Sequence, residues 1–362
     1  MKPYQTHLFE GKIITPGFLS LEPIFVYENK RYLNFLNLDC LYRKNNEYLR
    51  ETAKTSIESE GIASSQGSLS DLQRIMSEIK RFESLLLFPD EISAFFAIFS
   101  ICGPETAYFV DYETSASVNA VLQHRHVQYY NHNDLDQLTN LMSAEKGKVI
   151  IIDGLYEWIG SISPANELVK IARDNECIII VNEINSFGLV GRDGRGFIDL
   201  FNLYDQINIE IGSFSKFLGG FGCYVGTKKY LINKIKENIT NIHKPLPQFM
   251  VAVNCAALEF IKQGKLSKNI TEKLWKHSRY SISRLKQLGF KTSSETPIVV
   301  ISFNNDEEAE ELKKRLLLEQ VIVARNKERI RVCLSVEHSK DDIDYCIGKF
   351  ELIGKELGII HQ

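Results

Sequence analysis

CIIIVNEINSFGLVGRDGRG at residues 177–196 and IEIGSFSKFLGGFGCYVG at residues 209–226 decide how the rest of this sequence is interpreted. Two short apolar runs, at residues 178–181 and 207–211, each lead into a polar turn that contains glycine. Runs of this kind are typical of buried parallel strands. We therefore expect a functional site at the turns that follow them.

Lys216 lies in the second turn, after Ser213 and Ser215 and before Gly219 and Gly220. A desolvated lysine gives up its proton more readily, and the neutral amine is a nucleophile suited to Schiff-base chemistry. The two serine hydroxyls are suited to holding a phosphate beside it, and the glycines let a ligand approach the backbone closely. The alternative is a solvated lysine after a strand, which a lysine and two serines alone would favour.

Together the two segments resemble the α-oxoamine synthase family of pyridoxal-phosphate (PLP) enzymes, which includes serine palmitoyltransferase and 8-amino-7-oxononanoate synthase. Residues 182–196 match the family pattern DEAHSxGxxGxxGRG, and residues 212–225 match GTFSKxxGxxGGYV, in the same order and spacing. The resemblance implies an α/β fold of the fold-type I PLP-transferase (aspartate aminotransferase-like) kind. Such a fold has a mostly parallel central sheet and a small α+β C-terminal domain.

The chain is expected to have three parts: an N-terminal segment at residues 1–50, a large PLP-binding-type domain at 51–265 and a small C-terminal domain at 266–362. Strands are expected at residues 107–111 and 148–153. The second of these, a helix at 166–175 and the run that begins at Ile178 are expected to form a β-α-β unit. Ser70 and Gln73 have the spacing of a capping box and predict the start of a helix.

The resemblance also assigns the site. Lys216 is the residue that binds PLP, and Ser213 and Ser215 lie beside it. The family aspartate that faces the pyridine nitrogen corresponds to Asn182, so a charge-assisted hydrogen bond of about 1.5–3 kcal/mol becomes an ordinary one. Glu183, the next residue, is expected to point to the opposite face of the strand.

Two further positions differ from the family. Asn185 stands where a histidine contacts the ring hydroxyl, and Ser115 stands where a histidine stacks on the pyridine ring. A serine cannot stack on a ring. We nevertheless expect both residues to lie at the cofactor.

Acidic residues occupy two more cofactor positions. Asp90 and Glu91 lie in the turn whose backbone amides bind the PLP phosphate in the family, and Glu157 replaces a serine near the cofactor. Two like charges about 4 Å apart repel by roughly 4 kcal/mol at an effective dielectric near 20. Phosphate binding is expected to suffer unless both Asp90 and Glu91 turn outward.

Arg329 begins the segment RIRVCLSVEHS, residues 329–339, which resembles the family pattern RLRIxxxAxHT. The first arginine of that pattern binds the substrate carboxylate, and a guanidinium fork matches a carboxylate bidentately. The alternative is a surface arginine that alternates out of an edge strand.

Composition limits the function classes. The 362 residues are 44% hydrophobic and 25% charged, and a net charge of −3 argues against nucleic-acid binding. Seven scattered cysteines without a CxxC pair favour reduced thiols in a cytoplasmic protein over disulfides or a metal site. No stretch resembles a signal peptide or a membrane span.

Three functions remain open. The first is a PLP-dependent acyltransferase that condenses an amino acid with an acyl thioester and releases carbon dioxide, with a retuned site. The second is a catalytically degenerate homologue that serves as the partner subunit of a serine palmitoyltransferase-like complex. The third is a binding protein that uses the cleft for another ligand. The family implies a homodimer, or a heterodimer with a homologous chain.

Overall fold

The computed structural model describes residues 7–9, 12–14, 22–41, 46–58, 67–143, 145, 147–262 and 268–360. The chain divides into two compact units. Unit 1 comprises Met1–Tyr42, Trp158–Gly160 and Thr271–Gln362, and unit 2 comprises Arg43–Glu157 and Ser161–Ile270. The expected domain boundaries after residues 50 and 265 stay a prediction, since the unit with the C-terminal residues also includes Met1–Tyr42.

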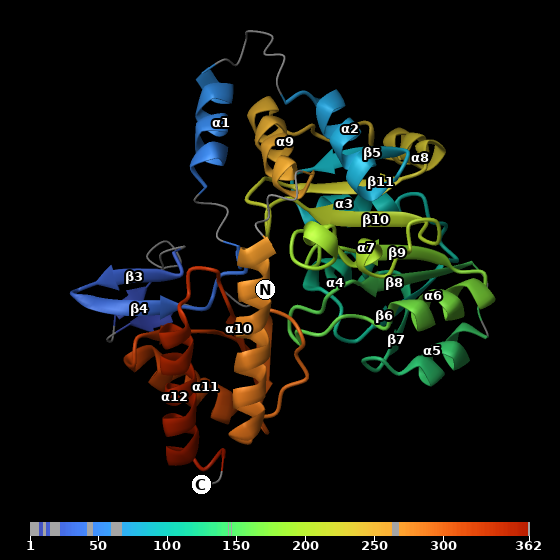
Figure 1. Cartoon of the computed structure of the whole chain (residues 1–362). Helices are drawn as coiled ribbons and strands as arrows, with labels where there is room; N and C mark the ends of the chain where they lie inside the picture. Colours follow the sequence, from blue (N-terminus) through green and yellow to red (C-terminus); the bar gives the residue numbers. More distant parts are fainter. Residues whose placement is uncertain are drawn as a thin grey trace. The chain divides into compact units, whose positions relative to one another are not determined.

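Unit 2 is built on a seven-stranded sheet with the order β5-β11-β10-β9-β8-β6-β7 (Figure 1). Its strands are β5 (Ser84–Phe88), β6 (Ala107–Asp111), β7 (His126–Tyr130), β8 (Lys148–Asp153), β9 (Ile178–Asn182), β10 (Ile209–Ser213) and β11 (Cys223–Thr227). Within this sheet β11 is antiparallel to both of its neighbours, and the other pairs are parallel. The carboxyl ends of β8, β9 and β10 therefore lie along one edge of the sheet.

The central strands are apolar because both faces of the sheet are covered. Ile150 and Ile151 follow one another on β8 and are 0% and 1% exposed. Consecutive strand residues point to opposite faces, so neither face of β8 reaches solvent. A core of strand and helix side chains, including Phe95, Phe99 and Ile180, fills the space between the sheet and its helices.

The helices of unit 2 lie around this sheet and against one another (Figure 1). They are α1 (Glu47–Glu58), α2 (Leu69–Lys80), α3 (Glu91–Phe99), α4 (Ala116–Leu122), α5 (Leu135–Met142), α6 (Ala165–Asp174), α7 (Phe197–Leu200), α8 (Lys229–Ile239) and α9 (Gln248–Lys262). Both α1 and α2 pack against α9, while α3 and α8 contact β5 and β11. In the described part of the chain, no helix combines the length and apolarity that crossing a membrane would need.

Unit 1 has an α+β architecture. One sheet has the order β13-β4-β3 and another the order β12-β15-β14. The strands are β3 (Ile24–Tyr27), β4 (Lys30–Asn34), β12 (Ile298–Ser302), β13 (Val321–Ile322), β14 (Ala324–Asn326) and β15 (Arg329–Cys333), and the backbone of β1 (His7–Phe9) pairs with that of β2 (Lys12–Ile14). The helices are α10 (Lys268–Gln287), α11 (Asp306–Leu318) and α12 (Lys340–Glu356).

The predicted α/β class with a mostly parallel central sheet is confirmed, and β6 and β8 have the predicted bounds. The capping box at Ser70 and Gln73 is wrong. Ser68 is the N-cap of α2: its side chain accepts the Asp71 N–H at 3.1 Å, and the Asp71 carboxylate accepts the Ser68 N–H at 3.1 Å. The edge-strand alternative for Arg329 is also wrong, because β15 is the central strand of its sheet.

Candidate active site

Lys216 lies in the turn that joins β10 to the antiparallel β11. The Phe214 N–H donates to Gly222 O at 2.9 Å, and the Gly220 N–H donates to Phe214 O at 2.9 Å, which closes the turn. The buried Asn254 of α9 accepts the Phe221 N–H at 2.8 Å and donates to Phe221 O at 2.9 Å. Backbone and side-chain hydrogen bonds thus fix the loop that carries the lysine.

The Lys216 ammonium is surrounded by oxygen atoms. Its Nζ donates to Asn185 Oδ1 at 2.8 Å and to Glu157 Oε2 at 3.2 Å, and lies 3.6 Å from Glu91 Oε1. The side chain is 19% exposed and is therefore not sealed from solvent. The structure therefore brings together the predicted Lys216 and Asn185 with two carboxylates that occupy altered cofactor positions.

A chain of side-chain hydrogen bonds leads from Glu91 to Asn182. Ser117 Oγ donates to Glu91 Oε2 at 2.9 Å and lies 3.2 Å from Ser115 Oγ. Asn182 Nδ2 donates to Ser115 Oγ at 3.3 Å. Ser115, the N-cap of α4, thus lies between Asn182, at the end of β9, and Ser117, which contacts Glu91.

Asn182 is bonded to a carboxylate on the neighbouring strand. The register of β8 and β9 pairs Asp153 with Asn182, and Asn182 Nδ2 donates to Asp153 Oδ1. Asp153 also accepts hydrogen bonds from the Thr114 hydroxyl and, at 3.3 Å, from the Ser115 N–H. Burial raises the pKa of Asp153 to about 7, and the hydrogen bonds from Thr114 and Asn182 oppose that rise.

Ser213 and Ser215 are adjacent, but they are not equally accessible. Their Oγ atoms are 2.8 Å apart, and the Ser215 N–H donates to Ser213 Oγ at 3.2 Å. Ser213 is fully buried, whereas Ser215 is half-buried. Ser215 is the more accessible of the two hydroxyls for an anion.

The two carboxylates at the start of α3 differ in orientation. Asp90 is the N-cap, and its Oδ1 accepts the Ser93 N–H at 2.8 Å. Glu91, in the first turn, instead extends toward Lys216 and Ser117. The Asp90 carboxylate thus occupies one backbone N–H at the start of α3, that of Ser93. The Glu91 carboxylate places a negative charge beside Lys216.

Glu183 belongs to a separate buried cluster, as its position on the strand predicts. Its Oε1 lies 3.1 Å from Lys80 Nζ, and Glu210 Oε1 lies 2.8 Å from the same nitrogen. The Glu183 carboxylate also accepts the N–H groups of Phe197 at 2.9 Å and Ile198 at 2.8 Å. These contacts tie β9 and β10 to α2 and leave Glu183 no role beside Asn182.

Arg329 lies at the start of β15, in unit 1. Its side chain is 21% exposed, its Nη1 donates to Trp158 O at 3.5 Å, and its Nε lies 3.8 Å from Glu328 Oε1. Arg331, two residues later, is buried with its guanidinium 4.5 Å from the centre of the Trp158 ring. Of these two arginines, Arg329 is the one with solvent access.

Sequence reasoning missed Asp153 and Thr114. The available signal was a carboxylate at the carboxyl end of the apolar run 149–152, the same position that Asn182 holds on the next strand. The contact itself depends on the register of β8 against β9, which a single sequence does not contain.

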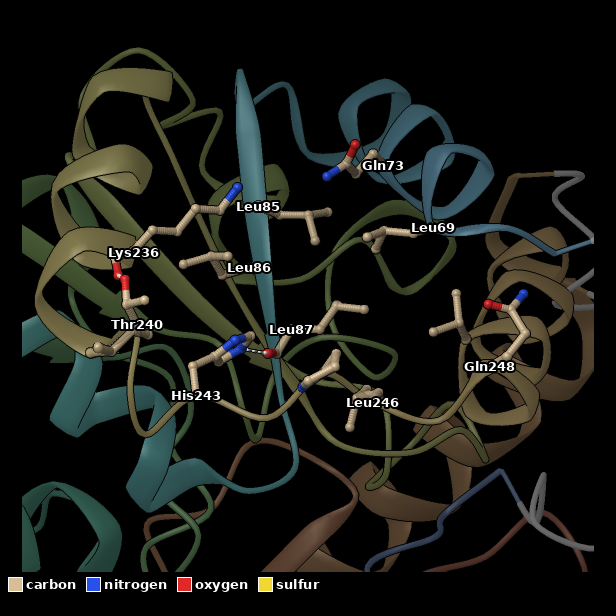
Figure 2. A pocket seen from close by; sticks show the side chains of 13 residues that line it. Leu69, Gln73, Leu85, Leu86, Leu87, Lys236, Thr240, His243, Leu246 and Gln248 are labelled. Carbon is tan, nitrogen blue, oxygen red and sulfur yellow. Dashed lines mark hydrogen bonds between the residues drawn. The ribbon is translucent and has the colours of Figure 1, made fainter.

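A cavity of about 500 Å³ lies beside β5, at one edge of the unit 2 sheet (Figure 2). Leu85, Leu86 and Leu87 line it from β5, and His243 Nε2 donates to Leu87 O at 2.8 Å. The remaining lining comes from α2, α8, α9 and the segment before α9. None of the predicted site residues lines this cavity.

Comparison with known proteins places this geometry in context. Residues 45–350 match the family model described as aminotransferase class I and II. An 8-amino-7-oxononanoate synthase of Petrotoga mobilis is 30% identical over 359 residues, which cover 91% of this chain and 90% of the relative.

Two solved structures share the fold. A serine palmitoyltransferase from S. paucimobilis with bound PLP–myriocin aldimine has a TM-score of 0.83 at 20% identity, covering 93% of this chain and 91% of the other. An 8-amino-7-oxononanoate synthase from Francisella tularensis has a TM-score of 0.81 at 21% identity, covering 91% of this chain and 99% of the other. The predicted fold-type I architecture is confirmed.

Proposed function

The chain belongs to the aminotransferase class I and II family and, within it, to the α-oxoamine synthases, which are PLP-dependent acyltransferases; from this premise we propose that it condenses an amino acid with an acyl thioester and releases carbon dioxide. The observation that carries the proposal is the position of Lys216. Its side chain is 19% exposed and lies in a loop fixed between β10 and β11, and its nitrogen is 2.8 Å from Asn185 Oδ1.

The donor set fits the aldehyde and ring of PLP. Lys216 offers a primary amine, and Asn185 and Asn182 offer amides at the ends of the strand and turn beside it. The fit is poorer for the phosphate, because Asp90 caps α3 and Glu91 points toward Lys216. We therefore expect PLP to bind, but with reduced affinity.

We assign a role to each predicted residue. When bound, PLP supplies the electron sink that allows a bond at the substrate α carbon to break. Lys216 is the point of covalent attachment, and Asn185 and Glu157 hold its nitrogen in place. Ser215, with Ser213 behind it, binds the phosphate.

The remaining assignments concern the ring and the substrate. Asn182 and Ser115 contact the ring, and Asn182 offers it an amide in place of the family carboxylate. Arg329 pairs with the carboxylate of the amino acid, because its planar guanidinium matches a carboxylate with two parallel hydrogen bonds.

A second candidate function is the partner subunit of a serine palmitoyltransferase-like complex. The observation that favours it is the pair of carboxylates, Glu91 and Glu157, around the Lys216 ammonium. This function requires a homologous catalytic chain, so co-purification of such a chain from the native source would distinguish it from the first.

We also propose that the chain forms a homodimer and lies in the cytoplasm. All seven cysteines are free thiols, which supports a reducing compartment. The exposed apolar side chains of Ile92 and Phe96 on α3 support a subunit interface.

The visible absorption spectrum of the purified chain with added PLP tests the function. We expect a lysine-dependent visible band in the wild type that is absent from Lys216→Ala. Lys229→Ala, which removes an exposed lysine on α8, is the matched control and should keep the band. A folded wild-type protein without the band would overturn the proposal.

A further inference from the structure

Three contacts fix the orientation of the buried Asn182 amide. Asp153 and Asn182 are each 2% exposed, and they face each other across the paired ends of β8 and β9. One Nδ2 hydrogen of Asn182 is donated to Asp153 Oδ1, and the other is directed at Ser115 Oγ at 3.3 Å. On the other side of the amide, Asn182 Oδ1 accepts the Ile184 N–H at 3.1 Å. The amide nitrogen therefore faces Asp153 and Ser115, and the oxygen faces the backbone of Ile184.

These contacts leave one hydrogen-bonding position of Asn182 open. An amide nitrogen has two hydrogens to donate, and an amide oxygen has two lone pairs that accept. Both hydrogens are used, whereas within the described part of the chain only the Ile184 N–H donates to the oxygen. The remaining capacity of Asn182 is therefore that of an acceptor, and a ligand that binds to it has to be a donor.

Asp153 holds the amide in this orientation. Its Oδ2 accepts the Thr114 hydroxyl and, at 3.3 Å, the Ser115 N–H, which leaves Oδ1 for Asn182 Nδ2. Because an ionised carboxylate only accepts hydrogen bonds, an amide that turned over would place its own oxygen against Asp153 and lose the bond. Hydrogen bonds in a chain also polarise one another, so an amide that donates to a carboxylate is a stronger acceptor at its oxygen.

We propose that Asp153 is a positioning residue that acts through Asn182: it keeps Asn182 Oδ1 as the acceptor for the N–H of a protonated pyridine ring. This inference rests on the proposed function, because it takes the ring of PLP as the ligand at Asn182. Asp153 then supplies, one hydrogen bond further from the ring, the negative charge that the family aspartate supplies directly. A nearby negative charge favours the protonated form of a base. The protonated ring is the stronger electron sink, as the proposed condensation requires.

The experiment uses PLP labelled with ¹⁵N in the pyridine ring and measures its NMR resonance in the loaded, full-length protein. The pH is set well above the pKa of Asp153, which is about 7, so that the carboxylate is ionised and a pyridine in water is unprotonated. We expect the wild type to show the pyridinium resonance. Asp153→Asn removes the charge and lets the Asn182 amide turn over, and it should shift the resonance to the position of an unprotonated nitrogen.

Rescue distinguishes this role from a merely structural one. Asp153→Asn combined with Asn182→Asp places a carboxylate directly at the ring and keeps the two groups paired, so it should restore the pyridinium resonance. The matched control is Asp111→Asn. Asp111 is another buried carboxylate at a strand end, on β6, but it contacts His132 Nδ1 at 3.0 Å and the Asn133 N–H at 3.2 Å. This variant should keep the wild-type resonance.

Thermal melts show which variants are folded. If Asp153→Asn does not fold, the milder Thr114→Val takes its place. Loss of the Thr114 hydrogen bond raises the pKa of Asp153 and leaves less of it ionised. In protein held near that pKa, the resonance of Thr114→Val should therefore lie closer to the unprotonated position than that of the wild type.

The outcomes separate this inference from the proposed function. In protein that has the lysine-dependent band, an unprotonated wild-type ring would overturn the inference and leave the proposed function standing. So would a pyridinium that persists in folded Asp153→Asn, a missing rescue, the same shift in Asp111→Asn, or an unshifted Thr114→Val where it is the variant used. Absence of the band from folded wild-type protein would overturn both.

Discussion

Glu91 is the side chain that most directly opposes an anionic cofactor. Its Oε1 is 3.6 Å from Lys216 Nζ, and the carboxylate is 27% exposed. Solvent weakens its repulsion of a phosphate, which we place at about 1 kcal/mol, or roughly fivefold in affinity. We expect Glu91→Gln to bind PLP about five times more tightly than the wild type, in a titration followed by absorption.

The matched control for that substitution is Glu105→Gln, which removes an exposed carboxylate that makes no contact with Lys216. It should leave the affinity unchanged. An affinity for PLP that does not rise in Glu91→Gln would show that Glu91 lies away from the bound phosphate.

His338 makes the stability of the chain depend on pH. The ring is fully buried; its Nδ1 accepts the Ser335 N–H at 3.0 Å, and its Nε2 donates to Pro23 O at 3.1 Å. Burial lowers the pKa of His338 from 6.5 to about 4. Between these two pH values His338 binds more protons in the unfolded chain than in the folded one. Its contribution to the free energy of unfolding therefore falls as the pH falls, by up to about 1.4 kcal/mol per pH unit.

We expect His338→Asn to be less stable than the wild type at pH 7 and to lose less further stability between pH 6.5 and 4. Urea unfolding at several pH values measures both effects. His124→Asn, at an exposed histidine, should retain the wild-type pH dependence. Parallel pH profiles for wild type and His338→Asn would contradict the assignment.

At the scale of single elements, the start of α2 distinguishes two serines that the sequence alone could not separate. Ser68 makes both bonds of a capping box with Asp71, whereas Ser70 lies inside the helix. Loss of an N-cap side chain typically costs about 1 kcal/mol. Ser68→Ala should therefore lower the free energy of unfolding by about 1 kcal/mol, and Ser70→Ala by clearly less, in chemical denaturation.

The error over this cap and the success with the strands have different physical origins. Residues 107–110 and 149–152 are apolar because both faces of the sheet are buried, and that signal is local. A cap depends on which serine takes the extended backbone conformation, and both Ser68 and Ser70 are followed three residues later by a polar side chain. The spacing of a serine and a polar residue therefore does not identify the cap.

The same distinction applies to the site. The turn that carries Lys216 could be predicted because its glycines and serines lie in one short stretch, residues 212–220. Asp153 and Asn182, which are in contact, are 29 positions apart in the sequence, and Glu157 and Lys216 are 59 positions apart. Such contacts follow from strand order and register, which the motif matches do not specify.

At the scale of the whole molecule, net charge and composition leave the oligomeric state open, and α3 provides the strongest indication of it. Ile92 and Phe96 are four residues apart on this helix and are 54% and 49% exposed. Residues at this spacing share one face of a helix. The helix also carries Glu91, so a subunit that covers this face would lie near Lys216.

We expect the wild type to sediment with twice the mass of one chain and Phe96→Glu to sediment as a monomer. A two-fold axis places each substituted residue in the same interface twice, and burial of an unpaired carboxylate there is strongly unfavourable. Leu318→Glu, which alters a 69% exposed side chain on α11, is the control and should remain a dimer. A Phe96→Glu protein that still sediments as a dimer would place the interface elsewhere, whereas a wild-type monomer that co-purifies with a homologous chain would favour the heterodimer.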